Sequence, residues 1–189
     1  MKTKLFTLAG LLLCTTAVSA QENKSGYQFT EIAKINVTPV KNQASTGTCW
    51  CFATTSFMEA ELLRMGKGEH DLAEMFIVHN TYLDRADKAV RTHGDVSFSQ
   101  GGSFYDVLYG MEKFGMVPEA EMRPGVMYGD TLSNHNELTA VSNAVVDAIA
   151  KGRSRSLQKD ANNQMLWKKA IASIHDIYLG ERPEKFTYN

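Results

Sequence analysis

The fold of this chain is decided by PVKNQASTGTCWCFA, residues 39–53. Pro39 disfavours helix in the residue before it, and residues 42–48 are small or turn-forming. From Cys49 onward apolar residues are spread around a helical period as far as position 65, where two glycines follow. The stretch therefore predicts a loop that enters a helix over residues 49–65. Because its apolar residues occupy a wide arc, we expect this helix to be buried on most sides.

A cysteine in the first turn of such a helix has a chemical consequence. The N-terminus of a helix carries unpaired N–H groups and partial positive charge, so a thiol placed there ionises more easily to the nucleophilic thiolate. Gln43, six residues upstream, can present its side-chain amide to the same point. Together with the backbone N–H of Cys49, this amide would hold the oxyanion of a tetrahedral intermediate. Cys49 is therefore the candidate nucleophile, Gln43 the candidate oxyanion donor, and Cys51 a packing residue.

These residues resemble a known family. Thr46-Gly47-Thr48-Cys49-Trp50 is similar to the signature around the papain and cathepsin nucleophile. The match departs at Thr46, where most papain relatives carry a disulfide cysteine, and this departure points to the bleomycin hydrolase or aminopeptidase C branch. The resemblance implies an α+β papain-like fold, of which the mainly helical half is present. It also implies a cysteine peptidase, with aminopeptidase preference, that works through an acyl-enzyme.

Three further features of the chain agree with this resemblance. The glycine pair Gly101-Gly102 resembles the backbone strip that binds extended substrate in this family, and Phe104 follows it as either a pocket wall or a core residue. Gly101, Gly102 and Phe104 are therefore the candidate substrate-binding residues. Weaker similarities cover residues 72–75, 114–118 and 179–186, so the resemblance spans nearly the whole chain after its first twenty residues.

The first twenty residues have the features of an export signal. Lysines at positions 2 and 4 precede an apolar run over residues 5–13, and small residues lead to Ala20, which suits cleavage after that residue. Of the 20 Lys and Arg, 18 remain after cleavage, against 21 Asp and Glu. We therefore expect an exported protein, periplasmic or extracellular, that binds neither nucleic acid nor, once the signal is removed, a membrane.

Helical periodicity dominates the rest of the chain. It predicts helices over residues 72–89 and 103–114, a fourth helix that begins near Ser133-Asn134, and a fifth that ends at Gly180. Convincing strands are almost absent. With the resemblance, this pattern divides the chain into a signal peptide, a helical nucleophile-bearing papain domain, and a helical insertion that leads to a β-rich domain: residues 1–20, 21–132 and 133–189.

A cysteine peptidase also needs a base to share the thiol proton and a third group to orient that base. In papain relatives this histidine and asparagine lie ~130–150 residues after the cysteine, and a helical insertion moves them further. None of the histidines of this chain has the strand context that the family uses; they are His70, His79, His93, His135 and His175. His175 has the best spacing, but we expect it at the edge of a helix. The catalytic histidine and asparagine are therefore expected outside this chain.

Two explanations for that absence stay open at this point. The chain is a fragment of a considerably longer peptidase, or it is a short product that is inactive alone. A rival interpretation is a non-catalytic helical binding or interaction protein with a relic cysteine. A dithiol redox or metal site at Cys49 and Cys51 is disfavoured, since residues two apart on a helix point to opposite sides. We expect no metal or cofactor, peptide substrates as partners and, from the resemblance, a homohexamer for the full-length enzyme.

Overall fold

The computed structural model describes residues 26, 27, 29–96, 98–122, 127, 134–152 and 159–187. These residues fall into two compact units, 1–34 and 35–189. In the first unit the described residues are extended, and the rings of Tyr27 and Phe29 lie 6.4 Å apart. The predicted signal peptide lies outside the described residues. Among those that are described, no helix has the length and apolar character needed to cross a membrane.

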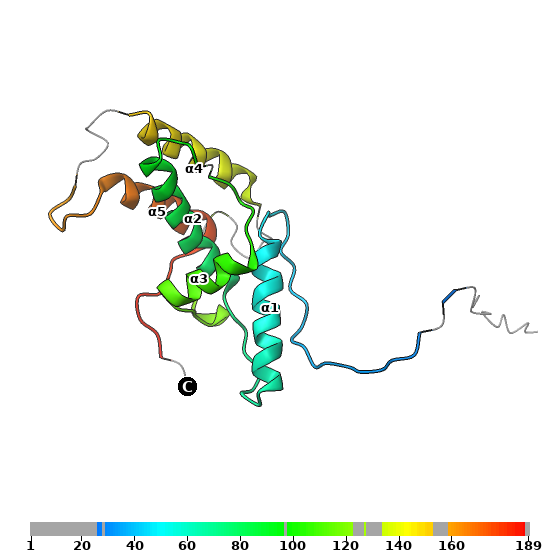
Figure 1. The fold of residues 1–189 in the computed structure, drawn as a ribbon. Helices are drawn as coiled ribbons and strands as arrows, with labels where there is room; N and C mark the ends of the chain where they lie inside the picture. Colours follow the sequence, from blue (N-terminus) through cyan, green and yellow to red (C-terminus); the bar gives the residue numbers. More distant parts are fainter. Residues whose placement is uncertain are drawn as a thin grey trace, which may run out of the picture. The chain divides into compact units, whose positions relative to one another are not determined.

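The second unit is helical (Figure 1). The described residues of the chain contain no β-strand, only isolated bridges such as the one between Leu72 and Pro118. This confirms the prediction of a mainly helical chain. The elements are α1 (Cys49–Arg64), α2 (Glu74–Arg91), α3 (Phe104–Phe114), the short 3₁₀ helix η1 (Glu119–Glu121), α4 (His135–Ala150) and α5 (Leu166–Leu179).

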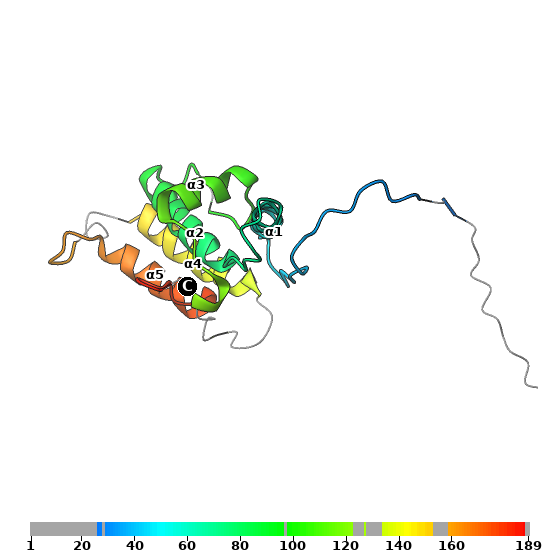
Figure 2. The ribbon, with the colours of Figure 1, turned by 90° about the horizontal axis from the view of Figure 1, so that it is seen from below.

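Helix α2 forms the centre of this unit. Eleven of its eighteen residues are buried, and it packs against α1, α3, α4 and α5. Figure 2 looks along α1 and shows α2 between α1 and α3 on one side and α4 and α5 on the other. Ile77, Val78 and Tyr82 of α2 are fully buried in this core. The extensive burial that we predicted for α1, the helix that begins at Cys49, is therefore found in the neighbouring helix α2.

Helix α1 is buried on one side only. Trp50, Cys51 and Glu59 face the interior, whereas Cys49 is exposed and Phe57 is 54% exposed. The prediction that this helix is buried on most sides is thus wrong for the described residues. The physical reason is that its apolar side chains are distributed over two surfaces, and the described residues cover one of them.

The helix ends follow the signals in the sequence with small shifts. Ser103 and Asp106 form a capping box at the start of α3, and the Asn134 side chain accepts a hydrogen bond from the Asn136 N–H at the start of α4. Helix α2 begins two residues later than predicted. The Leu72 N–H donates to Glu59 Oε1 and its carbonyl accepts from Lys41, so Leu72 is held outside the helix.

The inward faces of α4 and α5 differ from the predicted apolar stripes. Each contains a fully buried histidine, His135 in α4 and His175 in α5. Both rings contact Tyr82 of α2, and the His175 ring also contacts His79. The expectation that His175 sits at a helix edge is therefore wrong. Its Nε2 lies 3.1 Å from the Ser142 hydroxyl oxygen, and its ring stacks on Phe98, so a polar residue occupies a core position.

Candidate active site

The two cysteines among the described residues, Cys49 and Cys51, have opposite surroundings. Cys49 is the first residue of α1 and is exposed, whereas Cys51 is fully buried, with its thiol donating to the Glu74 carbonyl at 3.5 Å. Burial raises the pKa of the Cys51 thiol well above its usual value. The predicted divergence of the two thiols is confirmed. Cys49 alone of the pair is accessible to a substrate, and Cys51 packs in the core.

The first turn of α1 leaves its N–H groups open near Cys49. The Thr48 carbonyl accepts the N–H groups of Cys51 and Phe52, at 2.8 and 3.2 Å. The Thr48 side chain makes no capping bond, because its hydroxyl pairs instead with that of Thr46 at 2.5 Å. The Cys49 backbone N–H therefore has no side-chain cap from Thr48, and an N–H at the start of a helix is the kind of donor that can hold an oxyanion.

Gln43 is folded into the loop that precedes α1. Its Nε2 donates to the Thr46 carbonyl at 2.8 Å, and the Thr46 hydroxyl donates back to the Gln43 carbonyl at 2.9 Å. A glutamine amide has two N–H hydrogens, so one remains as a donor when the other is bound to Thr46. Ala44, with φ of 56°, makes the tight turn between these two residues. The loop thus presents Gln43 in a fixed position.

The loop and the glycine pair meet at Gln100. The Gly47 N–H donates to Gln100 Oε1 at 2.7 Å, and the Trp50 indole N–H donates to the Gln100 carbonyl at 2.9 Å. Gly101 and Gly102 follow directly and are exposed. A Cβ on Gly102 would lie 2.7 Å from the Trp50 ring, so glycine is required there by close approach. The candidate substrate strip therefore lies directly against the helix turn that carries Cys49.

Arg85 of α2 holds the glycine segment from beneath. Its guanidinium donates to the carbonyls of Ser99 and Gly101, pairs with Asp106 at 3.2 Å and lies over the Trp50 ring at 5.5 Å. The hydrogen bond to Ser99 measures 2.9 Å. The carbonyls of Ser99 and Gly101 are thus held by Arg85, while Gly101 and Gly102 stay exposed to solvent.

Phe104 lies on the exposed side of this region. It is 48% exposed, and its ring meets that of Phe57 at 6.1 Å in an edge-to-face arrangement. Tyr105, beside it, is 73% exposed. Of the two alternatives left open for Phe104, the described residues give it the surface position and not the core position.

A charged cluster underlies the nucleophile loop. The Lys41 ammonium contacts Glu59, Asp71 and Glu74 at 3.2, 2.5 and 2.9 Å, and Glu59 also accepts from the Thr38 hydroxyl at 2.6 Å. Glu59 and Glu74 are almost completely buried, whereas Asp71 is 66% exposed. Burial opposes the Lys41 charge, but hydrogen bonds to Asp71 and Glu74 hold its pKa above its usual value. Burial raises the pKa of Glu74 despite its bonds to Thr55 and Lys41.

The buried histidines are committed to other contacts. His79 Nε2 lies 2.7 Å from Asp176 Oδ1, and His135 Nδ1 lies 3.5 Å from the Tyr82 hydroxyl. Burial lowers the pKa of His135 to about 4 and that of His175, helped by the neighbouring His79, to about 3. All three are fully buried, so none of them is accessible to a substrate held by the exposed Cys49.

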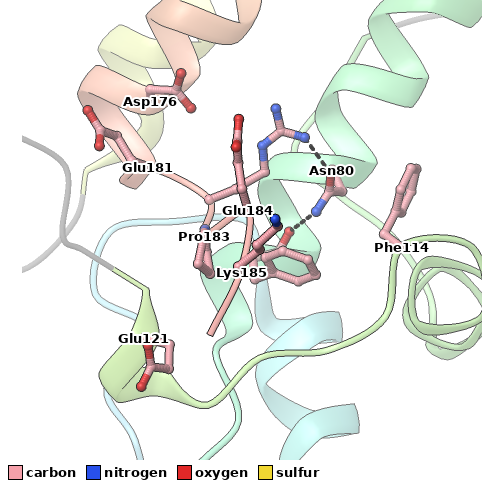
Figure 3. A pocket seen from close by; sticks show the side chains of 10 residues that line it. Asn80, Phe114, Glu121, Asp176, Glu181, Pro183, Glu184 and Lys185 are labelled. Atoms are coloured by element: carbon pink, nitrogen blue, oxygen red, sulfur yellow. Dashed lines mark hydrogen bonds between the residues drawn. The ribbon is translucent and has the colours of Figure 1, made fainter. Parts of the chain in front are cut away.

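A large pocket lies elsewhere on the unit (Figure 3). Its volume is about 810 Å³, and its polar lining comes from α2, α5 and the segment after α5. Figure 3 shows Asn80 bonded to the arginine of that segment, Arg182, whose guanidinium donates to Asn80 Oδ1 at 2.7 Å. None of the predicted site residues lines it. The candidate active site is thus an open surface, not a cavity formed by the described residues.

Several supporting residues were missed by the sequence analysis. Lys41 reaches Glu74 over 33 residues and Gly47 reaches Gln100 over 53 residues, so no local pattern reveals either contact. The charged residues around Arg85 in α2 resemble those of an ordinary solvent-exposed helix face, so the sequence does not indicate its contacts. Gly47, next to the cysteine motif, was a signal for the Gln100 contact, because a glycine can mark the close approach of another segment.

Comparison with known proteins agrees with this site. Residues 27–81, which include the nucleophile loop and α1, match the family described as papain family cysteine protease. The chain is 27% identical over 184 residues to Aminopeptidase E of Lactobacillus helveticus, a match that covers 83% of this chain and 39% of that protein. It is 26% identical over 136 residues to the mitochondrial Cysteine proteinase 1 of Saccharomyces cerevisiae, over 63% of this chain and 26% of that protein.

The chain therefore spans well under two thirds of the length of these relatives. Its helical unit, the exposed Cys49 at the start of α1 and the papain-family match over the same residues point to one conclusion. The chain is similar to the papain-like cysteine peptidases of the bleomycin hydrolase and aminopeptidase C branch, over part of their length.

Proposed function

We propose that this chain supplies the nucleophile of a cysteine peptidase that hydrolyses peptide bonds through an acyl-enzyme on Cys49. The observation that carries the proposal is an exposed thiol on the first residue of α1, with the N–H groups of that turn uncapped by the Thr48 side chain. The helix N-terminus favours the thiolate. The thiolate sulfur forms a bond to the substrate carbonyl carbon, whose π electrons move to the oxygen.

The oxyanion formed in that step would be held by two donors. One is the Cys49 backbone N–H, and the other is the Gln43 amide hydrogen not used by Thr46. Collapse of the intermediate expels the amine, which takes up the proton that the base had accepted from the thiol, and leaves a thioester. Water gives a proton to the same base and attacks the thioester carbon, so that the acyl group leaves as a carboxylic acid and the sulfur returns to its thiolate form.

An extended peptide would lie along Gly101 and Gly102, with Phe104 as a wall beside it. The exposure of all three residues supports this placement. The name of one relative, Aminopeptidase E, supports removal of residues from the N-terminus of the substrate. We include in the proposal an exported location, which rests on the first twenty residues, and a homohexameric assembly of the full-length enzyme.

The base is proposed to come from outside the described residues. His79, His135 and His175 are fully buried against α2, α4 and α5. Cys49, at the start of α1, is instead exposed among the described residues. A β-rich half that brings a histidine and an asparagine to this thiol would complete the site, and without it these residues would not turn over substrate.

The experiment is a peptidase assay on the full-length polypeptide that carries these residues. Substrates are aminoacyl and N-blocked peptidyl coumarins, so that their ratio reports aminopeptidase preference. We expect Cys49→Ala to abolish turnover, with a loss of at least about 10³-fold, while Cys51→Ala, the matched control, retains it. Equal turnover in wild type and Cys49→Ala would refute the peptidase assignment, and tight peptide binding without turnover would favour a binding protein.

A further inference from the structure

Gln100 brackets the nucleophile from both sides. Its side-chain Oε1 accepts the N–H of Gly47, two residues before Cys49, at 2.7 Å. Its main-chain carbonyl accepts the indole N–H of Trp50, one residue after Cys49, at 2.9 Å. One residue therefore contacts the chain on both sides of the thiol, at the backbone of Gly47 before it and at the Trp50 side chain after it. Gly101 and Gly102 continue directly from Gln100.

The other end of the Gln100 side chain reaches helix α4. Its Nε2 donates to the Thr139 hydroxyl at 2.7 Å and to the His135 carbonyl at 3.2 Å. A second connection runs in parallel, because the His135 N–H donates to the Ser45 carbonyl at 3.2 Å. The start of α4 is thus joined to the nucleophile loop both directly and through Gln100.

A side-chain amide can make all of these contacts at once. Glutamine supplies a carbonyl acceptor and two N–H donors on one planar group, and the described contacts use the acceptor and donate to two oxygens. The approach is also tight, since a Cβ on Gly47 would lie 2.8 Å from the Gln100 Cβ. A carboxylate keeps the acceptor but loses the donors, and alanine loses both.

We propose that Gln100 is a positioning residue that holds the Cys49 loop in register with the Gly101-Gly102 strip and couples both to helix α4. The catalytic consequence of this inference rests on the proposed function, whereas the positioning itself can be measured without turnover. A shift of 1 Å in a reacting group costs about 100-fold in rate. The hydrogen bonds of Gln100 therefore set the distance between the Cys49 thiol and a peptide held along Gly101 and Gly102.

The test uses the full-length polypeptide as wild type, Gln100→Ala, Gln100→Glu and Thr139→Val. Hydrogen exchange by mass spectrometry is measured for peptides covering residues 42–50, 99–104 and, as the internal control, α2. The second-order rate of Cys49 modification is measured with iodoacetamide and with a peptidyl chloromethyl ketone. Thermal unfolding of each variant sets a common working temperature well below every midpoint.

We expect Gln100→Ala to speed exchange over residues 42–50 by about tenfold, because a bond to a backbone N–H is lost, with α2 unchanged. The peptidyl reagent should slow by at least about tenfold and iodoacetamide by less than about twofold. Gln100→Glu should recover most of the peptidyl rate, because it still accepts from Gly47. Thr139→Val should have a smaller effect in the same direction, since it removes one contact to α4.

Wild-type exchange over residues 42–50 in Gln100→Ala would overturn the inference, as would a uniform rise that includes α2, which indicates a general loss of stability. Equal peptidyl rates in Gln100→Ala and Gln100→Glu would also overturn it. If wild type reacts no faster with the peptidyl reagent than with iodoacetamide, the proposed function fails, and the exchange data still decide whether Gln100 positions the loop.

Discussion

Two buried polar clusters hold this unit together in opposite ways. Under the nucleophile loop, Lys41 is the shared cationic partner of Glu59 and Glu74, and every contact involves an ion. Between α2, α4 and α5, three histidines pack as neutral rings, each with one ring nitrogen that has no partner among the described residues. The first arrangement depends on every charge keeping its partner, and the second depends on no charge appearing. The charged cluster and the histidine cluster should therefore lose their contribution to stability under different conditions.

The largest effect is expected from Lys41→Met. This change leaves the nearly buried carboxylates of Glu59 and Glu74 without a counter-ion, and removing one member of a buried pair costs about 3–5 kcal/mol. Urea unfolding at pH 7 measures the loss. Lys151→Met is the control, because its pair with Asp147 is exposed on both sides and should change stability by less than about 0.5 kcal/mol. A loss as small as the control's would show that the charged cluster does not hold the loop.

Acid should destabilise the histidine cluster between α2, α4 and α5. Burial keeps the pKa values of His135 and His175 at about 4 and about 3, below the unfolded value of about 6.5. Between these limits the unfolded state binds more protons, so stability is complete above pH ~6.5 and falls as the pH drops toward 3. Asp176 partly opposes this at His79, and Arg182 reinforces it.

A single substitution separates the histidines from the other acid-sensitive groups. His135→Leu removes a buried titrating ring whose nearest hydrogen-bond partner, the Tyr82 hydroxyl, is 3.5 Å away. The stability lost between pH 7 and pH 4 should shrink by roughly 2 kcal/mol. His93→Asn is the matched control, since His93 is exposed and its φ of 54° suits asparagine. Unfolding curves at several pH values provide the measurement, and parallel profiles for wild type and His135→Leu would contradict the account.

The smallest effect is expected from Asp71→Asn. Asp71 contacts the same lysine as the buried carboxylates, at 2.5 Å, but is 66% exposed, so water and salt screen the pair. We expect a loss below about 1 kcal/mol that vanishes in 1 M salt. Urea unfolding at low and high salt checks this. A loss comparable to that of Lys41→Met would mean that burial does not decide the strength of these contacts.

The sequence predicted the parts of this structure that depend on neighbouring residues. The helix over residues 103–114 was expected one residue early, and the loop into Cys49 was placed correctly, because caps, glycines and small residues act locally. The contacts of Lys41 and Gln100 were not predictable in this way, because their partners lie far away in the sequence. His175 was misplaced for a related reason. A histidine interrupts an apolar stripe in the sequence, yet a neutral ring with one bond to Ser142 fits the core.

The account depends on Cys49 being the accessible, reactive thiol while Cys51 is inert. The most direct measurement is the rate at which iodoacetamide alkylates each cysteine in the folded full-length polypeptide at pH 7, followed by mass spectrometry. We predict that Cys49 is modified at least about 100-fold faster than Cys51, because a fully buried thiol reacts only when the structure opens. Equal rates for the two cysteines, or faster modification of Cys51, would contradict the central claim.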